Sequence, residues 1–160
     1  MGHALVGINS KHHSKVSKVI INLSAPKSPG YTMFESSTTA IYTREALFEH
    51  LMILLAGRIA EEIFYDVSVT TGAINDFGEA FKLAEKMIIY YGMGRQLIYP
   101  SSSDKFKEMI DKEVLNLIHD AYQMSKLILI NHKDLIKECA ILLEKEKVIP
   151  AEKIYELMDK

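Results

Sequence analysis

One segment in the middle of the chain constrains the fold most, because its apolar side chains recur at a constant interval of four residues. An interval of three to four residues places side chains on one face of an α-helix. The segment Thr43 to Tyr65 therefore predicts a long helix whose apolar ridge must be covered by other elements. The residues that make this ridge are Leu47, Leu51, Leu55, Ile59 and Ile63.

Further amphipathic patterns fill most of the remaining chain and predict more helices. These helices are expected over about Ala73 to Tyr91, about Phe106 to Ile130, Leu135 to Glu146, and from Pro150 onward. The 160 residues, 48% of them hydrophobic, suit one domain with an ample core. We expect two parts, one with the strands and two long helices over about 1–94 and a C-terminal helical bundle over about 103–160.

Two short segments near the N-terminus differ from the helical pattern. Val16 to Ser24 is rich in β-branched residues and predicts a strand, and Tyr31 to Ser36 predicts a second one. The stretch Ala25 to Gly30 between them carries two prolines and a glycine, which predicts a loop. The fold class expected is mainly α, with a small N-terminal β-sheet that has one free edge.

Composition excludes several classes of function. The formal net charge is −2, from 19 basic and 21 acidic residues, so nucleic acid is not an expected partner. No segment has the run of about 18 apolar residues that spans a bilayer, and the N-terminus does not resemble a signal peptide. Cys139 is the only cysteine and is expected to be a buried apolar residue in a helix.

Several polar residues could be structural or functional. Asp76 falls in the first turn of the second helix, where a carboxylate is favoured by the helix dipole. Glu61 and Glu62 end the preceding helix, where the dipole disfavours them, and such conflicts are tolerated at functional sites. His3 is either an ordinary histidine near a chain end or one half of a metal site. His12 and His13 lie between lysines and are expected in a solvated loop.

The middle of the chain carries a specific resemblance. AGRIAEEIFY, followed by SVTTGAIND, resembles the peptidase domain of the FtsH family of AAA-type ATP-dependent zinc metalloproteases. MGHALVG resembles the end of that family's His-Glu-x-Gly-His helix, and the two strands and C-terminal helices resemble its sheet and helical bundle. The resemblance implies a zinc-metallopeptidase domain over residues 1–160.

The resemblance also implies roles for individual residues. His3 corresponds to the second zinc-binding histidine, Asp76 to the third metal ligand, and Glu61 to a partner that orients a ligand imidazole. The second strand corresponds to an edge strand that binds substrate backbone, although a plain hairpin would give the same pattern. Its residues are Gly30, Tyr31, Thr32, Met33 and Phe34.

The chain departs from the family motif at its first residue. Met1 stands at the motif's variable position, so the first histidine and the general-base glutamate would precede Met1, and this chain contains no catalytic residue. Either the sequence is truncated or starts at an internal methionine, or it is a natural inactive homologue. On both explanations we expect weak zinc binding or none, and no cleavage by the chain as written.

Function, cofactors and partners follow from the resemblance alone. The parent protein is expected to degrade unfolded or membrane proteins as a ring, typically a hexamer, anchored in a bacterial inner membrane or an organelle membrane. Zinc is the expected cofactor, and ATP and magnesium would act only through an ATPase domain outside this chain, which itself is expected to be soluble. The alternatives are a non-catalytic assembly scaffold and a helical interaction module, but the second leaves the motif unexplained.

Overall fold

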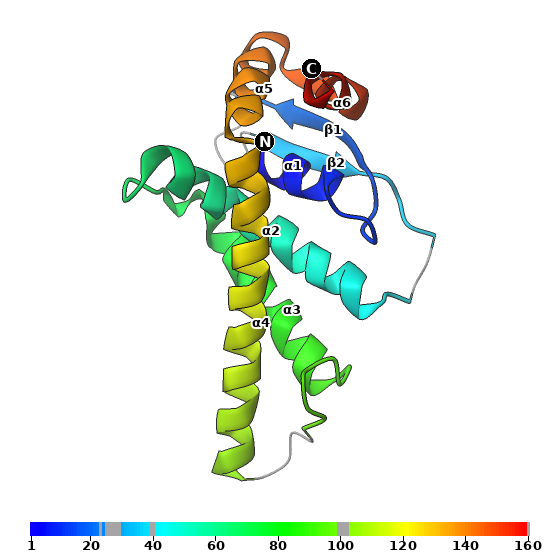
Figure 1. Cartoon of the computed structure of the whole chain (residues 1–160), viewed down its shortest axis with the longest axis vertical. Helices are drawn as coiled ribbons and strands as arrows, with labels where there is room; N and C mark the ends of the chain where they lie inside the picture. The colour runs from blue at the N-terminus through cyan, green and yellow to red at the C-terminus, as the bar shows by residue number, and fades with distance from the viewer. Residues whose placement is uncertain (23, 25–29, 39–40, 99–102, 160) are drawn as a thin grey trace.

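The computed structural model describes residues 1–22, 24, 30–38, 41–98 and 103–159 and shows a mainly helical molecule with a small sheet at one end (Figure 1). This confirms the fold class. The elements are α1 (Gly2–Ile8), β1 (Val16–Ile21), β2 (Gly30–Phe34), α2 (Arg44–Tyr65), the 3-10 turn η1 (Thr71–Ala73), α3 (Ile74–Ile89), α4 (Asp104–Asn131), α5 (Lys133–Glu146), β3 (Val148–Pro150) and α6 (Ala151–Met158).

Helix α2 is the central element, as its apolar ridge predicted. Its N-terminus is capped by Thr43, whose hydroxyl accepts a hydrogen bond of 3.2 Å from the backbone of Ala46. Leu51, Leu55 and Ile59 are buried in the main core cluster. The helix packs against α1, α3 and α4, so three other helices cover its apolar surface.

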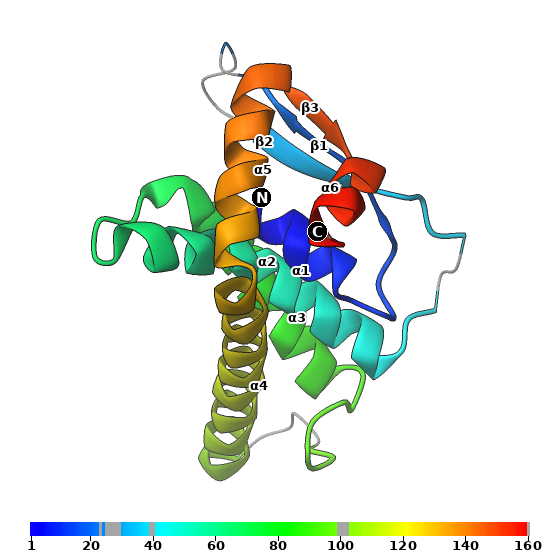
Figure 2. The ribbon, with the colours of Figure 1, turned by 45° about the horizontal axis from the view of Figure 1, so that its top comes forward.

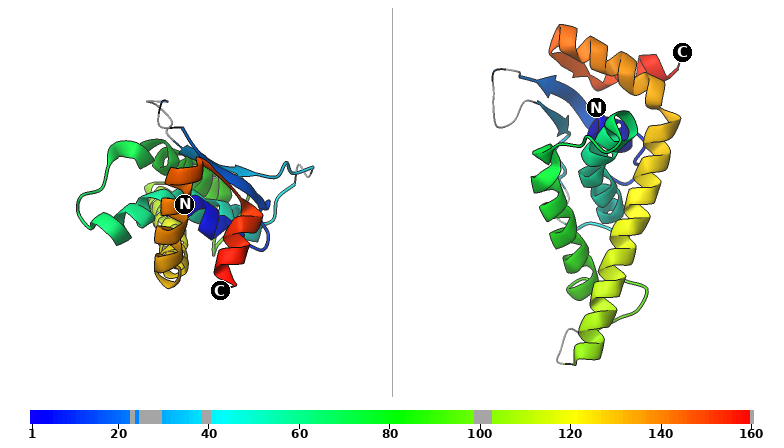
Figure 3. Two further views of the ribbon diagram at one scale, coloured as in Figure 1. Left: turned by 90° about the horizontal axis from the view of Figure 1, so that it is seen from above. Right: turned by 90° about the vertical axis from the view of Figure 1, so that its left-hand side faces the viewer.

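Helix α4 connects the two ends of the molecule. It runs alongside α2 and α3 and then leads to α5, which lies with α6 against the sheet (Figures 2 and 3). The buried hydroxyl of Ser125 on α4 donates a 3.1 Å hydrogen bond to the backbone carbonyl of Met52 on α2. Both of the parts expected at 1–94 and 103–160 contribute to one apolar core, and their division into two units stays a prediction.

The sheet has three antiparallel strands in the order β2-β1-β3. The two predicted N-terminal strands are present and pair with each other, from Val16 opposite Phe34 to Ile21 opposite Gly30. β3 was not predicted, because it is only three residues long and ends at Pro150, which we interpreted as a helix start. Most of the predicted loop at 25–30 lies outside the described residues. In the described part of the chain β2 pairs on one side only, so its other edge is open.

Helix α1 packs directly on the backbone of α2. A Cβ atom added to Gly2 would lie 2.5 Å from the carbonyl oxygen of Ala56, so only glycine permits this approach. Ala4, Leu5 and Val6 are fully buried beside this contact. The short helix is therefore an integral part of the core. Within the described residues, no helix combines the length and apolar character needed to cross a bilayer.

Replacing Leu51 by Ala tests the central position of α2. Leu51 is fully buried, and the cavity left by its truncation should lower the free energy of unfolding by about 2–5 kcal/mol. The same change at Leu127 on α4, which is 56% exposed, should alter it by less than about 0.5 kcal/mol. Urea denaturation of both variants measures the difference, and equal losses would contradict the packing described.

Candidate metal site and substrate groove

His3 is oriented by the backbone of α2. Its Nδ1 lies 2.7 Å from the carbonyl oxygen of Ile53. A carbonyl oxygen can only accept a hydrogen bond, so Nδ1 carries the proton and Nε2 of the neutral ring keeps a lone pair. We expected Glu61 to orient a ligand imidazole, but for His3 this contact is supplied by a main-chain carbonyl.

Gly57 makes that contact possible. A helical side chain covers the surface of the preceding turn, so a side chain at position 57 would cover the carbonyl of Ile53. A Cβ atom added to Gly57 would lie 2.7 Å from Nε2 of His3 and 3.0 Å from its Cε1. The Gly of the AGR motif thus leaves room for the imidazole and exposes its hydrogen-bond acceptor.

Asp76 faces His3 from the first turn of α3. Its Oδ2 lies 3.5 Å from Nε2 of His3, and both side chains are about one-third exposed. Burial lowers the pKa of His3, although the Ile53 carbonyl and the Asp76 carboxylate act in the opposite direction. The neutral form of the imidazole is therefore favoured. The fold brings together two residues that are far apart in the sequence, at the crossing of α1, α2 and α3.

Glu61 positions the loop that leads to Asp76. Its carboxylate accepts hydrogen bonds from the backbone N–H of Thr70 at 2.7 Å and from the Thr70 hydroxyl at 2.9 Å. The same hydroxyl accepts a 3.1 Å bond from the backbone of Gly72, within η1. Because η1 continues directly into α3, these hydrogen bonds of Glu61 help to position the first turn of α3, which carries Asp76.

Glu62 has a different partner, although it is the next residue. Its carboxylate accepts hydrogen bonds from the hydroxyl of Tyr122 on α4 and, at 2.8 Å, from Nε of Arg58. Burial raises the pKa of Glu62, but these two hydrogen bonds, together with the positive charges of Arg58 and Lys126, outweigh it and leave the pKa below its ordinary value. Glu62 therefore joins α2 to α4, away from His3.

The donor atoms of His3 and Asp76 fit a shared zinc ion. A neutral imidazole nitrogen and a carboxylate oxygen each offer a lone pair, and both are common zinc ligands. Tetrahedral bonds of about 2.0–2.2 Å place two donor atoms roughly 3.3–3.6 Å apart, and the observed separation is 3.5 Å. Among the described residues, no group of three or more His, Cys, Asp or Glu is placed to hold a metal ion. The described chain thus offers two donors.

A groove of about 380 Å³ runs from this pair along β2. Ile21 N–H donates to the carbonyl of Lys147, on the β3 side of β1. Backbone groups alternate along a strand, so Ile20 bonds towards β2 at Tyr31, and the backbone groups of Gly30, Thr32 and Phe34 face the open edge. The lining residues are His3, Gly30, Tyr31, Thr32, Phe34, His50, Ile53, Leu54, Gly72, Asn75 and Asp76.

Two other imidazoles lie beyond the far end of β2. Nε2 of His13 and Nδ1 of His50 are 2.9 Å apart, and the His13 ring contacts Phe34 edge to face at 4.9 Å. Burial and the neighbouring His13 lower the pKa of His50. His12 is exposed, as expected for a solvated loop, but His13 is half-buried and joined to α2.

Comparisons with known proteins show which family this chain resembles. The model of peptidase family M41 matches residues 1–157. The chain is 33% identical over 153 residues to ATP-dependent zinc metalloprotease FtsH 3 of Phytoplasma mali (strain AT), an alignment that covers 94% of this chain and 25% of that protein. It is 33% identical over 175 residues to ATP-dependent zinc metalloprotease FTSH 1, chloroplastic, of Arabidopsis thaliana, which covers 92% of this chain and 24% of that protein.

A mammalian protein is also similar. The chain is 29% identical over 171 residues to mitochondrial inner membrane m-AAA protease component AFG3L2 of Mus musculus, covering 98% of this chain and 21% of that protein. The chain spans about a quarter of the length of the curated relatives it matches.

Replacing Gly57 by Ala should displace the His3 imidazole. The new methyl group would lie 2.7 Å from Nε2, so the ring must move away from Asp76 and lose the Ile53 carbonyl, at a cost of about 1–3 kcal/mol in stability. Two-dimensional ¹H–¹⁵N spectra of the histidine rings would show the loss of the Nδ1 hydrogen bond. In the control Gly78→Ala, where an added Cβ meets nothing within 4 Å, the spectra should not change and stability should rise by about 0.5–1 kcal/mol. An unchanged His3 signal in Gly57→Ala would contradict the close contact.

Stability should depend on pH through His50. Its pKa is lowered from the ordinary value of 6.5, so below that pH the unfolded chain binds a proton more readily than the folded chain does. The stability contributed by the neutral imidazole is complete above the ordinary pKa and falls as the pH drops towards the lowered one. His50→Asn should therefore flatten the slope of unfolding free energy against pH in this window, whereas His119→Asn, at an exposed position of α4, should not. Equal slopes in all three proteins would refute the assignment.

Proposed function

Because this chain belongs to peptidase family M41, we propose that it is the proteolytic domain of an ATP-dependent zinc metalloprotease that degrades unfolded or membrane proteins. The observation that carries the proposal is the approach of His3 Nε2 to Asp76 Oδ2 at 3.5 Å, on a groove bounded by an open strand edge. The family accounts for the class of chemistry, and the groove supports a polypeptide substrate.

In this proposal His3 and Asp76 are two of the ligands of the catalytic zinc. The remaining ligand and the general base would be the first His and the Glu of a His-Glu-x-Gly-His motif, of which Met1, Gly2 and His3 match the last three positions. A zinc ion bound here supplies Lewis acidity towards a peptide carbonyl and activation of a water molecule. The Ile53 carbonyl fixes the tautomer of His3, and Glu61 fixes the approach of Asp76 through Thr70.

The open edge of β2 would hold the substrate. A polypeptide that pairs with Gly30, Thr32 and Phe34 donates and accepts main-chain hydrogen bonds, which do not depend on its side chains. This mode suits an enzyme that must accept many unfolded sequences. Tyr31 and Met33, which are 51% and 38% exposed, would provide weaker contacts to the substrate side chains.

Other functions belong to the longer proteins that this chain resembles. The relatives named above are ATP-dependent proteases, and one is a component of the mitochondrial inner membrane. We propose that segments absent from this sequence supply ATP and magnesium binding, a membrane anchor and assembly into a ring, typically a hexamer. An assembly scaffold without catalysis is the competing function, and the following experiment distinguishes the two.

Extension of the N-terminus by His-Glu should create a zinc-binding protease. The extended chain would carry His-Glu-Met-Gly-His, with both imidazoles one helical turn apart on α1. It should bind one zinc ion and slowly cleave unfolded casein, whereas the chain as printed should bind zinc weakly and cleave nothing. Zinc content after dialysis and release of labelled casein fragments provide the two measurements.

Asp76→Ala in the extended chain should abolish zinc retention and cleavage, because it removes a ligand. Glu79→Ala is the matched control, since Glu79 is an acidic residue of the same helix that pairs only with the exposed Lys82 among the interactions described. It should retain both properties. A folded, extended chain that binds no zinc would overturn the metal site, and zinc binding without cleavage would favour the scaffold.

A further inference from the structure

A second, larger cavity adjoins the groove. Its volume is about 510 Å³, and His50 forms part of the wall of both. The groove ends at Phe34, and the larger cavity begins at Ser37, three residues further along the chain. An extended polypeptide lying on the edge of β2 would therefore pass from the groove to the cavity within a few residues, because each residue advances about 3.3 Å.

The lining of this cavity favours an uncharged side chain. Among the described residues that line it, none is Lys, Arg, Asp or Glu. Ile41 and Tyr42 at its margin are 84% and 50% exposed, and Leu47 and Ala46 of α2 contribute further apolar surface. Burying a charged group here would cost solvation, and among the described lining residues only His12, His13 and His50 could offer it a partner charge.

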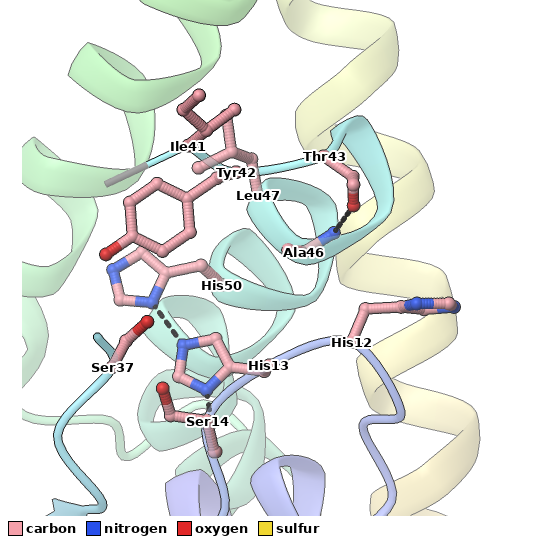
Figure 4. A pocket seen from close by; sticks show the side chains of 10 residues that line it. All are labelled: His12, His13, Ser14, Ser37, Ile41, Tyr42, Thr43, Ala46, Leu47 and His50. Atoms are coloured by element: carbon pink, nitrogen blue, oxygen red, sulfur yellow. Dashed lines mark hydrogen bonds between the residues drawn. The ribbon is translucent and has the colours of Figure 1, made fainter. Parts of the chain in front are cut away.

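The wall shared with the groove is held in place by several contacts. Nδ1 of His13 donates to the carbonyl of Ser14 at 3.0 Å, so its Nε2 accepts a hydrogen bond from Nδ1 of His50. Figure 4 shows these two imidazoles meeting edge to edge, while His12 points away from them. The Glu49 carboxylate also accepts hydrogen bonds from the backbone N–H groups of residues 11–13. A wall fixed in this way keeps its shape when a ligand binds.

We propose that this cavity is a specificity pocket, which receives an aromatic or large aliphatic side chain of the polypeptide held on the open edge of β2. The inference rests on the proposed function, because it takes its ligand from the strand edge. It adds that the domain discriminates among unfolded chains by one uncharged side chain beyond Phe34. Main-chain pairing alone would not discriminate.

The test uses short fluorescent peptides and the chain as printed, so that binding is measured without catalysis. A peptide of alternating Thr and Ala carries a single Phe at each position in turn, and binding is followed by fluorescence anisotropy. Phe at one or two positions should improve affinity roughly tenfold or more. Leu should give a smaller gain at the same positions, and Lys or Glu should give none.

Substitutions then test whether the higher affinity of the Phe peptides comes from this cavity. Ile41→Asp places a charge at the cavity margin and should bring the affinity ratio of the Phe and Thr peptides close to one. Leu97→Asp is the control, since Leu97 is 87% exposed and does not line the cavity, and it should preserve the ratio. A benzoylphenylalanine in place of Phe should crosslink to the segment 41–47, which a mass spectrum of the digested adduct would show.

Thr32→Pro separates this inference from the function on which it rests. Proline removes the N–H at the open edge without removing a hydrogen bond between β1 and β2, and should weaken all peptides equally. Suppose that Thr32→Pro abolishes binding of every peptide, but the unsubstituted chain binds the Phe peptides no better than the Thr peptide. This result would overturn the pocket and leave the strand-edge function standing. A higher affinity for the Phe peptide that persists in Ile41→Asp would overturn the pocket in the same way. A gain that disappears in Ile41→Asp while Thr32→Pro changes nothing would support the pocket and overturn the strand edge.

Two further outcomes would overturn the proposal. If no peptide binds at millimolar concentration, both the pocket and the strand edge fail. If the chain self-associates and Ile41→Asp abolishes the association in sedimentation experiments, the cavity is an interface between two copies and does not receive substrate.

Discussion

Two neighbouring backbone carbonyls of α2, at Met52 and Ile53, accept the hydrogen bonds that join this helix to two others. They can do so because small residues leave them uncovered. A larger side chain one turn later in the helix would cover these oxygens, but the residues at those positions are Ala56 and Gly57. Ser125 of α4 donates to the first carbonyl and His3 of α1 to the second. One turn of one helix thus joins the long C-terminal helix and the short N-terminal helix, and it determines where the candidate metal ligand points.

Much of this arrangement could be predicted from the sequence, and the rest could not for physical reasons. The apolar ridge of α2 has a clear period of four residues, and β1 is rich in β-branched residues, so both elements were predicted, although β1 ends at Ile21 and not at Ser24. The proximity of His3 and Asp76 followed from family motifs. The partner of His3 did not, because the Ile53 carbonyl is a backbone atom and no residue type marks it. β3 was missed because three residues ending in proline carry no periodic signal.

The two glutamates of the AEE motif show how adjacent residues can position different elements of the fold. Consecutive side chains on a helix project about 100° apart, so Glu61 reaches the loop before α3 while Glu62 reaches α4. The sequence suggested a functional reason for two carboxylates at a helix C-terminus, where the dipole disfavours them. In the structure each negative charge is instead compensated by hydrogen-bond donors from another element.

The order of strands also determines when the sheet can be completed. β1 is the middle strand, and its partner β3 lies more than a hundred positions later, so Lys18 meets Pro150 only after α2, α4 and α5 have been synthesised. Closing so long a loop is entropically costly and slows folding. During translation β1 would have β2 as its sole partner, and one of its edges would be exposed to other chains. β3, which leaves the ribosome after β1 and β2, would then shield this edge and leave β2 as the side on which another polypeptide can add.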